Sequence, residues 1–112
     1  MIYVDYQQGC ERNERWRWDT VSHLSCDPTD DLEPLHRFAA GLGLQRSWFQ
    51  PRGGIMPHYD LSPTKRLMAL QRGATELGDN KAIVAVIRAW RTFQGQKRAD
   101  QADQAEQGTL AL

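Results

Sequence analysis

The chain has 112 residues and a mass of 12.8 kDa, which suits one small domain. Its hydrophobic fraction of 40% and charged fraction of 25% are those of a globular protein and argue against a disordered chain. No apolar run approaches the roughly 18 residues of a membrane span, and the opening MIYVD lacks the positive charge and long apolar run of a secretory signal. We therefore expect a cytoplasmic protein with no membrane partner.

The net charge of zero conceals an uneven distribution along the chain. Residues 1–43 hold four Arg against eight Asp or Glu, for a net charge of −4. Residues 44–98 hold ten Lys or Arg against three acids, for +7, and residues 99–112 hold three acids and no base, for −3. A basic middle between acidic ends indicates either a surface that faces an anion or ordinary solvated helix faces.

The first residues predict a short strand followed by a long loop. Residues 2–5 alternate as a strand does, and Asp5 ends that strand, at the edge where parallel α/β sheets usually bind ligands. Residues 6–20 are polar and irregular. Within them, Trp16 and Trp18 are two positions apart, where they either cap the core or stack on a planar ligand.

Residues 29–44, TDDLEPLHRFAAGLGL, predict the clearest helix. Asp31 is the expected N-cap, because Pro34 then falls in the first turn, where its missing N–H is not needed. Either Gly41 or Gly43 is expected to end the helix in a left-handed turn. The buried stripe consists of Leu32, Leu35, Ala39 and Leu42, with Phe38 on its flank and His36 on its shoulder.

The middle of the chain predicts a second strand and a second helix. The strand covers residues 46–50, RSWFQ, and residues 51–54 are expected to form a turn or a mobile loop. Ser62 is a helix cap with proline directly after it, and this helix is expected to run to Arg72 and to stop at Gly73. Its expected inward residues are Leu67 and Leu70.

Residues 74–77, ATEL, predict a third strand, and Asp79 or Asn80 is expected to cap a last helix. Strands that alternate with helices predict an α/β fold with a short, mostly parallel three-stranded sheet and three helices, in a three-layer-like arrangement. We expect residues 1–98 to form this single domain and residues 99–112 to form a polar, flexible C-terminal tail or an extension of the helix. The apolar face of the last helix comprises Ile83, Val86, Ile87, Trp90 and Phe93.

Two histidines and two aspartates are the catalytic candidates. In the predicted fold, the loops after the first two strands meet at one edge of the sheet, which would bring together Asp5, His23, His58 and Asp60. His58 or His23 would act as a general acid or base, and Asp5 and Asp60 would be orienting groups or metal ligands. The alternative is that His58 and Asp60 only bond to nearby backbone.

A divalent metal is a further alternative, because imidazoles and carboxylates suit zinc, iron or manganese. No two histidines have the spacing of a helical metal site, and the two cysteines form no Cys-x-x-Cys motif. The sequence spacing therefore assigns no metal ligands. A metal would require the fold itself to gather ligands from among His23, His36, His58, Asp5 and Asp60.

The start of the second helix favours an anion. Its first N–H groups and partial positive charge attract a phosphate, and Lys65 and Arg66 lie in its first turns, where a bound anion would offset their unfavourable interaction with the helix dipole. Arg46 and Arg52 are expected to approach from the neighbouring loop. The chain has no Gly-x-Gly-x-x-Gly or P-loop motif, which argues against a standard nucleotide cradle. The ligand-binding candidates are His36, Tyr59, Lys65, Arg66 and Trp48.

Several short motifs occur in an order typical of one family: MIYVD, SHLSCD, LHRFAAGLGL, SWF, HYDLSPTKR and ALQRGA. On these motifs, which span residues 1–77, the chain resembles the domain-of-unknown-function family 4031, small proteins of bacteria and their phages. The resemblance implies a shared set of residues that includes every histidine of the chain, but no particular reaction. The polar segment before Val21 and the tail past Lys97 fall outside these motifs.

Two functions are consistent with these observations. The first is a His/Asp pocket that binds a phosphate-bearing ligand, either a nucleotide or a nucleic acid, and hydrolyses a phosphoester. The alternative is a non-catalytic accessory protein of a phage or bacterium that binds a host protein or a nucleic acid. That protein would use Trp16, Trp18, the acidic tail, and Lys81 and Arg88, which share one face of the last helix. The apolar face of the same helix also predicts a homodimer.

Overall fold

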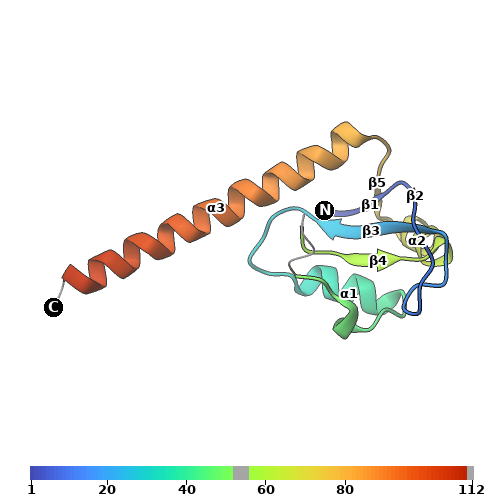
Figure 1. The fold of residues 1–112 in the computed structure, drawn as a ribbon, viewed down its shortest axis with the longest axis horizontal. Helices are drawn as coiled ribbons and strands as arrows, with labels where there is room; N and C mark the ends of the chain where they lie inside the picture. Colours follow the sequence, from blue (N-terminus) through green and yellow to red (C-terminus); the bar gives the residue numbers. More distant parts are fainter. Residues whose placement is uncertain (52–55, 111–112) are drawn as a thin grey trace.

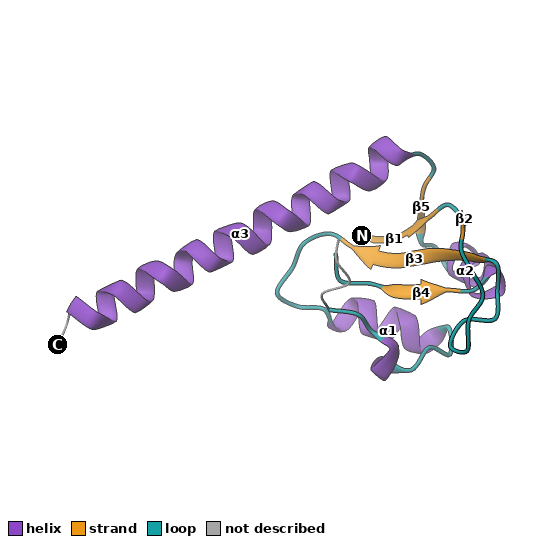
Figure 2. Cartoon of the chain, viewed as in Figure 1, coloured by secondary structure: helices purple, strands orange, loops and turns teal. Residues whose placement is uncertain are grey.

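The computed structural model describes residues 1–51 and 56–110 of the chain. Its elements are, in order, β1 (Ile2–Asp5), β2 (Gln8–Gly9), β3 (Thr20–Cys26), α1 (Glu33–Gly41), the 3-10 helix η1 (Arg46–Trp48), β4 (Tyr59–Leu61), α2 (Pro63–Gln71), β5 (Thr75–Leu77) and α3 (Asn80–Leu110) (Figure 1). Strands and helices both contribute to the fold, so the predicted α/β class is confirmed (Figure 2). Most of the predicted turn at residues 51–54, including Arg52, lies outside the described residues.

The sheet has five strands and is mixed, which corrects the predicted three-stranded and mostly parallel sheet. β3 pairs antiparallel with β1, β2 and β4. Among the described strands, the parallel pairing is that of β1 with β5. Because no helix connects β1 to β3, or β2 to β3, these strands can return beside one another in opposite directions. The predicted alternation of strands and helices missed this part of the sheet.

β3 forms in a segment that the sequence analysis treated as loop. Its side chains are mostly buried on both faces of the sheet, and two of them are small and polar: Ser22 and Ser25 are each 1% exposed. Serines and a histidine at inward positions conceal the apolar alternation that identifies a strand. The structure therefore gives the protein a central strand where hydrophobicity alone predicted none.

The predictions for residues 46–50 and for the segment around His58 were also wrong. Residues 46–50 form η1 and one isolated bridge rather than a strand, and Trp48 is 51% exposed. The bridge joins Gln50 to His58 through two backbone hydrogen bonds of 2.9 and 3.1 Å. This bridge is followed by β4, so the segment predicted as a loop after the second strand is itself part of the sheet.

The three helices confirm the main helix predictions, with corrections at single residues. Leu32 is the N-cap of α1, although the predicted cap Asp31 still accepts the Glu33 N–H at 3.1 Å. Ser62 caps α2 as predicted, accepting the Lys65 N–H at 3.3 Å. Leu67, predicted to point inward, is 57% exposed.

Two glycines and one aspartate mark the ends of the helices. Gly43 and Gly73 follow α1 and α2 with φ angles of +83° and +98°, which is the left-handed conformation that glycine adopts at low cost. Asp79 begins α3 by accepting the Ala82 N–H at 2.8 Å. α3 continues to Leu110, so residues 99–110 extend the helix.

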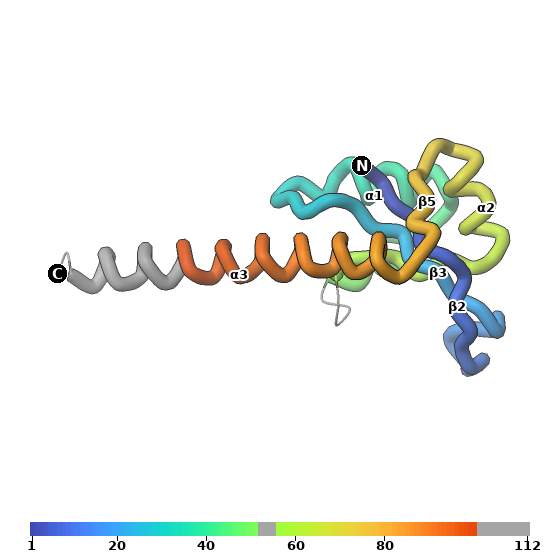
Figure 3. Tube along the Cα trace, turned by 90° about the horizontal axis from the view of Figure 1, so that it is seen from above, coloured from blue at the N-terminus to red at the C-terminus, as the bar shows by residue number. Residues whose placement is uncertain are grey.

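The helices are arranged around the strands in a way that leaves α3 partly free. Figure 3 shows α1 and α2 on the same side of the strands. α3 contacts β5, and the Trp90 indole N–H donates a hydrogen bond of 2.8 Å to the Cys26 carbonyl. Among the side chains of α3 whose burial is described, Ile83, Val86 and Trp90 are buried, and the helix then projects away from the sheet (Figure 1). None of the described helices is long and apolar enough to cross a membrane.

Neighbouring side chains of β3 and β4 point to opposite faces of the sheet, so that an apolar pair lies in the core and a polar pair on the other face. Leu24 lies opposite Tyr59, and these side chains are 0% and 1% exposed in the core. His23 lies opposite Asp60, and this pair faces the other side of the sheet because neighbouring side chains in a strand alternate. His58 is two residues before Asp60 and shares its face. The polar residues thus gather across the face of the sheet, and not in loops at one edge as predicted.

Candidate functional site

Asp5 fixes the position of His23. The Asp5 side chain is buried at the end of β1, where its Oδ1 accepts the backbone N–H of His23 at 2.7 Å. Its Oδ2 lies 2.7 Å from His23 Nδ1 and also accepts a hydrogen bond of 3.2 Å from Gln8 Nε2. A carboxylate can only accept, so the hydrogen of a neutral His23 ring resides on Nδ1. The lone pair on Nε2 is then free to bind another group.

His58 is held in the same way by a backbone group. Its Nδ1 lies 2.7 Å from the Met56 carbonyl oxygen, which can only accept, so Nδ1 carries a hydrogen and Nε2 of the neutral ring carries the lone pair. Burial by itself lowers the pKa of His58, but the interactions with Asp60 and the Met56 carbonyl outweigh burial and raise this pKa above its ordinary value. His58 is therefore disposed to hold positive charge beside Asp60.

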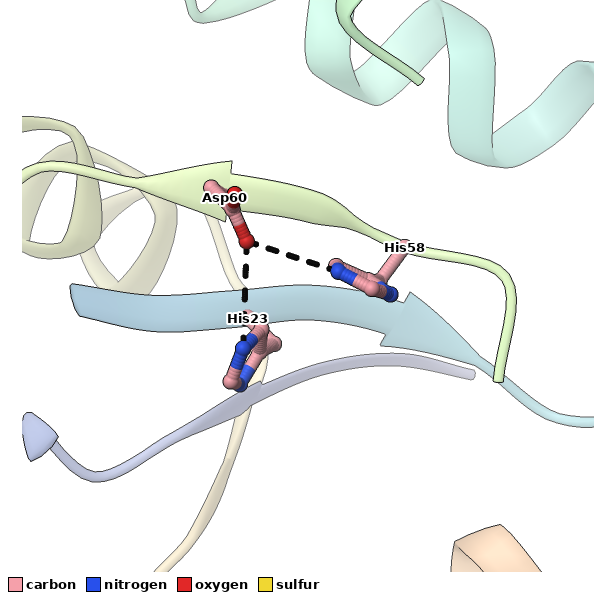
Figure 4. A group of neighbouring side chains, drawn as sticks. All are labelled: His23, His58 and Asp60. Carbon is pink, nitrogen blue, oxygen red and sulfur yellow. Dashed lines mark ion pairs between the residues drawn. The ribbon is translucent and has the colours of Figure 1, made fainter. Parts of the chain in front are cut away.

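Asp60 faces both rings (Figure 4). Its Oδ1 is 3.4 Å from His58 Nε2 and 3.8 Å from His23 Nε2, and the two rings meet edge to face with their centroids 4.9 Å apart. Gln50 Nε2 donates a hydrogen bond of 2.7 Å to Asp60 Oδ2. Burial raises the pKa of Asp60, but the bonds to His58 and Gln50 outweigh it, so the pKa is lowered and the carboxylate stays charged.

We call His23, His58 and Asp60 the triad. One ligand atom from each lies within 4.8 Å of the other two. The side chains of His23 and Asp60 are 22% and 34% exposed, whereas that of His58 is 7% exposed, so solvent reaches the triad from the side of His23 and Asp60. Such an arrangement can bind a cation, or it can accept and donate protons near neutral pH.

The structure brings four of the five predicted metal or acid–base groups together and separates the fifth. His36 Nδ1 lies 2.7 Å from the Tyr59 hydroxyl, and its ring packs edge to face on Phe49 at 4.6 Å. Because Tyr59 and Asp60 are neighbours in β4, their side chains point to opposite faces of the sheet. His36 and Tyr59 therefore lie across the sheet from the triad.

The other ligand-binding candidates contact parts of the fold outside the triad. The Lys65 ammonium donates to the Leu42 carbonyl, which joins α2 to the end of α1. Arg66 Nε donates to the Asp5 carbonyl at 3.1 Å, and its Nη2 lies 2.8 Å from Glu76 Oε1. Trp48 is on η1 and half exposed. Among the described contacts, none joins these three side chains to the triad.

Three groups that support the triad could not be identified from the sequence: the side chains of Gln8 and Gln50 and the carbonyl of Met56. No motif points to them. Gln8 and Met56 contact residues only three and two positions away, whereas the Gln50 contact depends on strand pairing. The Gln50 side chain reaches Asp60 because Gln50 bridges to His58, two residues before Asp60. Only knowledge of that bridge would have identified it.

A family model described as "Protein of unknown function (DUF4031)" matches residues 2–89. The match covers β1 to β5 and the first part of α3, and it includes Asp5 and the whole triad. It extends the resemblance from residue 77 to residue 89. No curated protein and no solved structure matches the chain.

Proposed function

The chain belongs to the DUF4031 family, and we propose that it binds a phosphate-bearing ligand, a nucleotide or a nucleic acid, and hydrolyses a phosphoester at the triad. The observation that carries this proposal is the convergence of His23 Nε2, His58 Nε2 and Asp60 Oδ1 on a partly exposed face of the sheet. The excess of basic residues between positions 44 and 98 supports an anionic ligand.

The reaction would proceed by attack of a water oxygen on phosphorus. The ester P–O bond breaks, and one proton of the water is transferred, directly or through solvent, to the leaving oxygen. The triad would polarise and orient the attacking water, and Asp5 would keep His23 in the required orientation. The three atoms can do so either as acid–base groups or by holding a cation.

Hydrolysis of chromogenic phosphate monoesters and diesters tests this function, with and without added divalent metal ions. We expect measurable turnover that falls by about 100-fold or more in His58→Ala, His23→Ala and Asp60→Asn. Asp19→Asn is the matched control, because this carboxylate is exposed on the loop before β3 and pairs weakly with Arg12 at 3.7 Å. Turnover that is absent, or that is equal in wild type and in all three triad variants, would contradict the proposal.

A second candidate function rests on a basic stripe along α3. Lys81, Arg88, Arg91 and Arg98 are exposed, and their successive spacings of seven, three and seven residues place them on one helix face. The sequence has no Asp or Glu between Asp79 and Asp100, so no acid within this stretch offsets the stripe. This stripe fits the phosphate backbone of a nucleic acid.

Salt-dependent retention of DNA and RNA tests the second function. We expect the logarithm of affinity to fall against the logarithm of salt concentration with a slope of about −3 to −4. The double variant Lys81→Glu/Arg88→Glu should reduce the size of this slope by about 2, whereas His58→Ala should leave it unchanged. Equal retention of wild type and the double variant would exclude the stripe as the binding surface.

A further inference from the structure

We infer that the triad is a divalent-metal site in which His23 Nε2, His58 Nε2 and Asp60 Oδ1 bind one ion. This inference deepens the proposed function, because it identifies how the same site would activate water. It stands on its own geometry, however, and metal binding can be measured without any substrate. Two histidines and one carboxylate that leave coordination positions open are the ligand set of many catalytic metal centres.

The first argument comes from the hydrogens of the two rings. Each Nδ1 is already committed, to the Asp5 carboxylate in His23 and to the Met56 carbonyl in His58, both at 2.7 Å. The neutral rings therefore direct two Nε2 lone pairs toward the oxygen of Asp60. Three acceptor atoms that face one another repel unless a positive charge lies among them. A proton on one ring relieves this repulsion for two of the atoms, whereas a metal ion bonds to all three atoms at once.

The second argument is the spacing of the three atoms. A charge-assisted N–H···O bond is about 2.7–2.9 Å long. The distances from Asp60 Oδ1 are longer, 3.4 Å to His58 Nε2 and 3.8 Å to His23 Nε2. Ligand atoms that each lie about 2.0–2.2 Å from one ion are about 3.0–3.5 Å apart. The distances of 3.4 and 3.8 Å are nearer to this spacing than to that of a hydrogen bond, and side-chain rotations would bring the three atoms, which lie within 4.8 Å of one another, onto one ion.

The third argument is that each proposed ligand residue is held in place by a hydrogen bond between its other polar atom and a neighbouring group. The metal-ligating histidine of a protein almost always donates its other N–H to a carboxylate or a backbone carbonyl, which fixes the ring and increases its basicity. His23 has the carboxylate of Asp5, and His58 has a carbonyl. Asp60 is oriented by Gln50, which donates to the oxygen that faces away from the rings. Asp5, the Met56 carbonyl and Gln50 thus orient the three proposed ligands, as the outer hydrogen-bond partners of a metal centre do.

The donor set also limits the ion and its chemistry. Two imidazole nitrogens and one carboxylate oxygen, without a thiolate, suit Zn²⁺, Fe²⁺ or Mn²⁺. The exposed parts of His23 and Asp60 leave the solvent side for water or for an oxygen of the substrate. A bound ion of this kind lowers the pKa of a coordinated water and so produces a nucleophile near neutral pH.

Titration of the chelator-treated full chain with Co²⁺ and Zn²⁺ tests the inference, with the visible spectrum of Co²⁺ and calorimetry as readouts. We expect one equivalent to bind with a dissociation constant in the micromolar range or below. His23→Gln, His58→Gln and Asp60→Asn should each weaken binding by about 100-fold or more. His36→Gln removes the third imidazole, which lies across the sheet on Tyr59, and should leave affinity unchanged. Circular dichroism confirms that each variant is folded, and Asp60→Asn preserves side-chain shape if a histidine variant unfolds.

Absence of stoichiometric binding to the folded wild type would overturn the inference, as would equal weakening by His36→Gln. The outcomes also separate this inference from the proposed function. Metal binding by a protein that hydrolyses no phosphoester would support the metal site and remove the hydrolase. Hydrolysis by the chelator-treated protein, together with no stoichiometric metal binding, would support the hydrolase and overturn the metal site.

Discussion

The Oδ2 atom of Asp5 lies 2.7 Å from Nδ1 of His23, and Oδ1 of the same carboxylate accepts the backbone N–H of His23 at 2.7 Å. One buried side chain therefore sets both the backbone position and the ring orientation of a residue on the neighbouring strand. This double contact makes Asp5 a positioning residue for the triad, and it leads to a specific prediction.

Asp5→Asn should weaken metal binding by about 10- to 100-fold while the protein stays folded. The amide oxygen can still accept the His23 backbone N–H, which leaves the NH₂ group facing Nδ1. That ring nitrogen must then accept, the ring hydrogen moves to Nε2, and the metal loses its lone pair. The Co²⁺ titration and the thermal melt measure affinity and folding separately. An affinity within twofold of wild type would show that Asp5 does not control the ring.

Gln50→Ala should weaken metal binding by about 10-fold, because Asp60 Oδ2 loses the donor that holds it at 2.7 Å. The backbone bridge between Gln50 and His58 needs no side chain, so β4 should remain paired. Gln45→Ala is the control, since this glutamine precedes η1 and the hydrogen bond described for its side chain is with Ser47 and not with the triad. If both variants bind the metal as wild type does, Gln50 has no role in orienting Asp60.

Replacing Ser22 with alanine should not destabilise the protein. The Ser22 hydroxyl is buried and has no hydrogen-bond partner among the described residues. Its removal is therefore expected to leave the free energy of unfolding unchanged or to increase it by up to about 1 kcal/mol. Ser62→Ala is the contrasting variant, because it removes the cap of α2 and should cost about 1 kcal/mol. Chemical denaturation compares the two, and a larger loss in Ser22→Ala would contradict the assignment of an unpaired hydroxyl.

Acid should destabilise the fold through His36. Burial, and to a lesser extent Arg46, lowers the pKa of His36 in the folded protein. As the pH falls below about 6.5, the unfolded chain takes up a proton at this position before the folded chain does, so the free energy of unfolding decreases. Between about pH 7.5 and pH 5.5, wild type should lose more stability than His36→Gln.

His58 contributes with the opposite sign, because its folded pKa is raised and its stabilisation is lost as the pH rises. The comparison with His36→Gln leaves His58 in place and so isolates the contribution of His36. Denaturant unfolding at several pH values, in a buffer with chelator, measures both proteins. Parallel pH profiles for the two proteins would contradict the prediction.

The sequence predicted the individual elements of the fold better than their pairing. Ser62, Gly43 and Gly73 acted as expected, because caps and left-handed turns depend on local chemistry. The strands β3 and β4 were missed since their stability comes from neighbours that are distant in the chain, and since buried serines and a histidine replace the usual apolar residues. Without these strands, the mixed sheet could not be predicted.

For the site, the sequence identified the right residue types but not their partners. It grouped Asp5, His23, His58 and Asp60, and these four residues do lie together in the structure. His36 was grouped with them because it is also a histidine, yet its position on α1 places it across the sheet. Helix position alone could not reveal on which face of the sheet α1 packs.

The direct opposition of His23 and Asp60 has a consequence for how the protein folds. A slip of β4 along β3 by one residue would turn Asp60 into the core and set an apolar side chain opposite His23, so only one alignment assembles the ligands. An ion that bridges the two strands would therefore bind only the correctly aligned sheet. It would stabilise that alignment, and the melting temperature of the protein would rise with the concentration of the ion. The same contact that prepares the site for chemistry would select the native sheet.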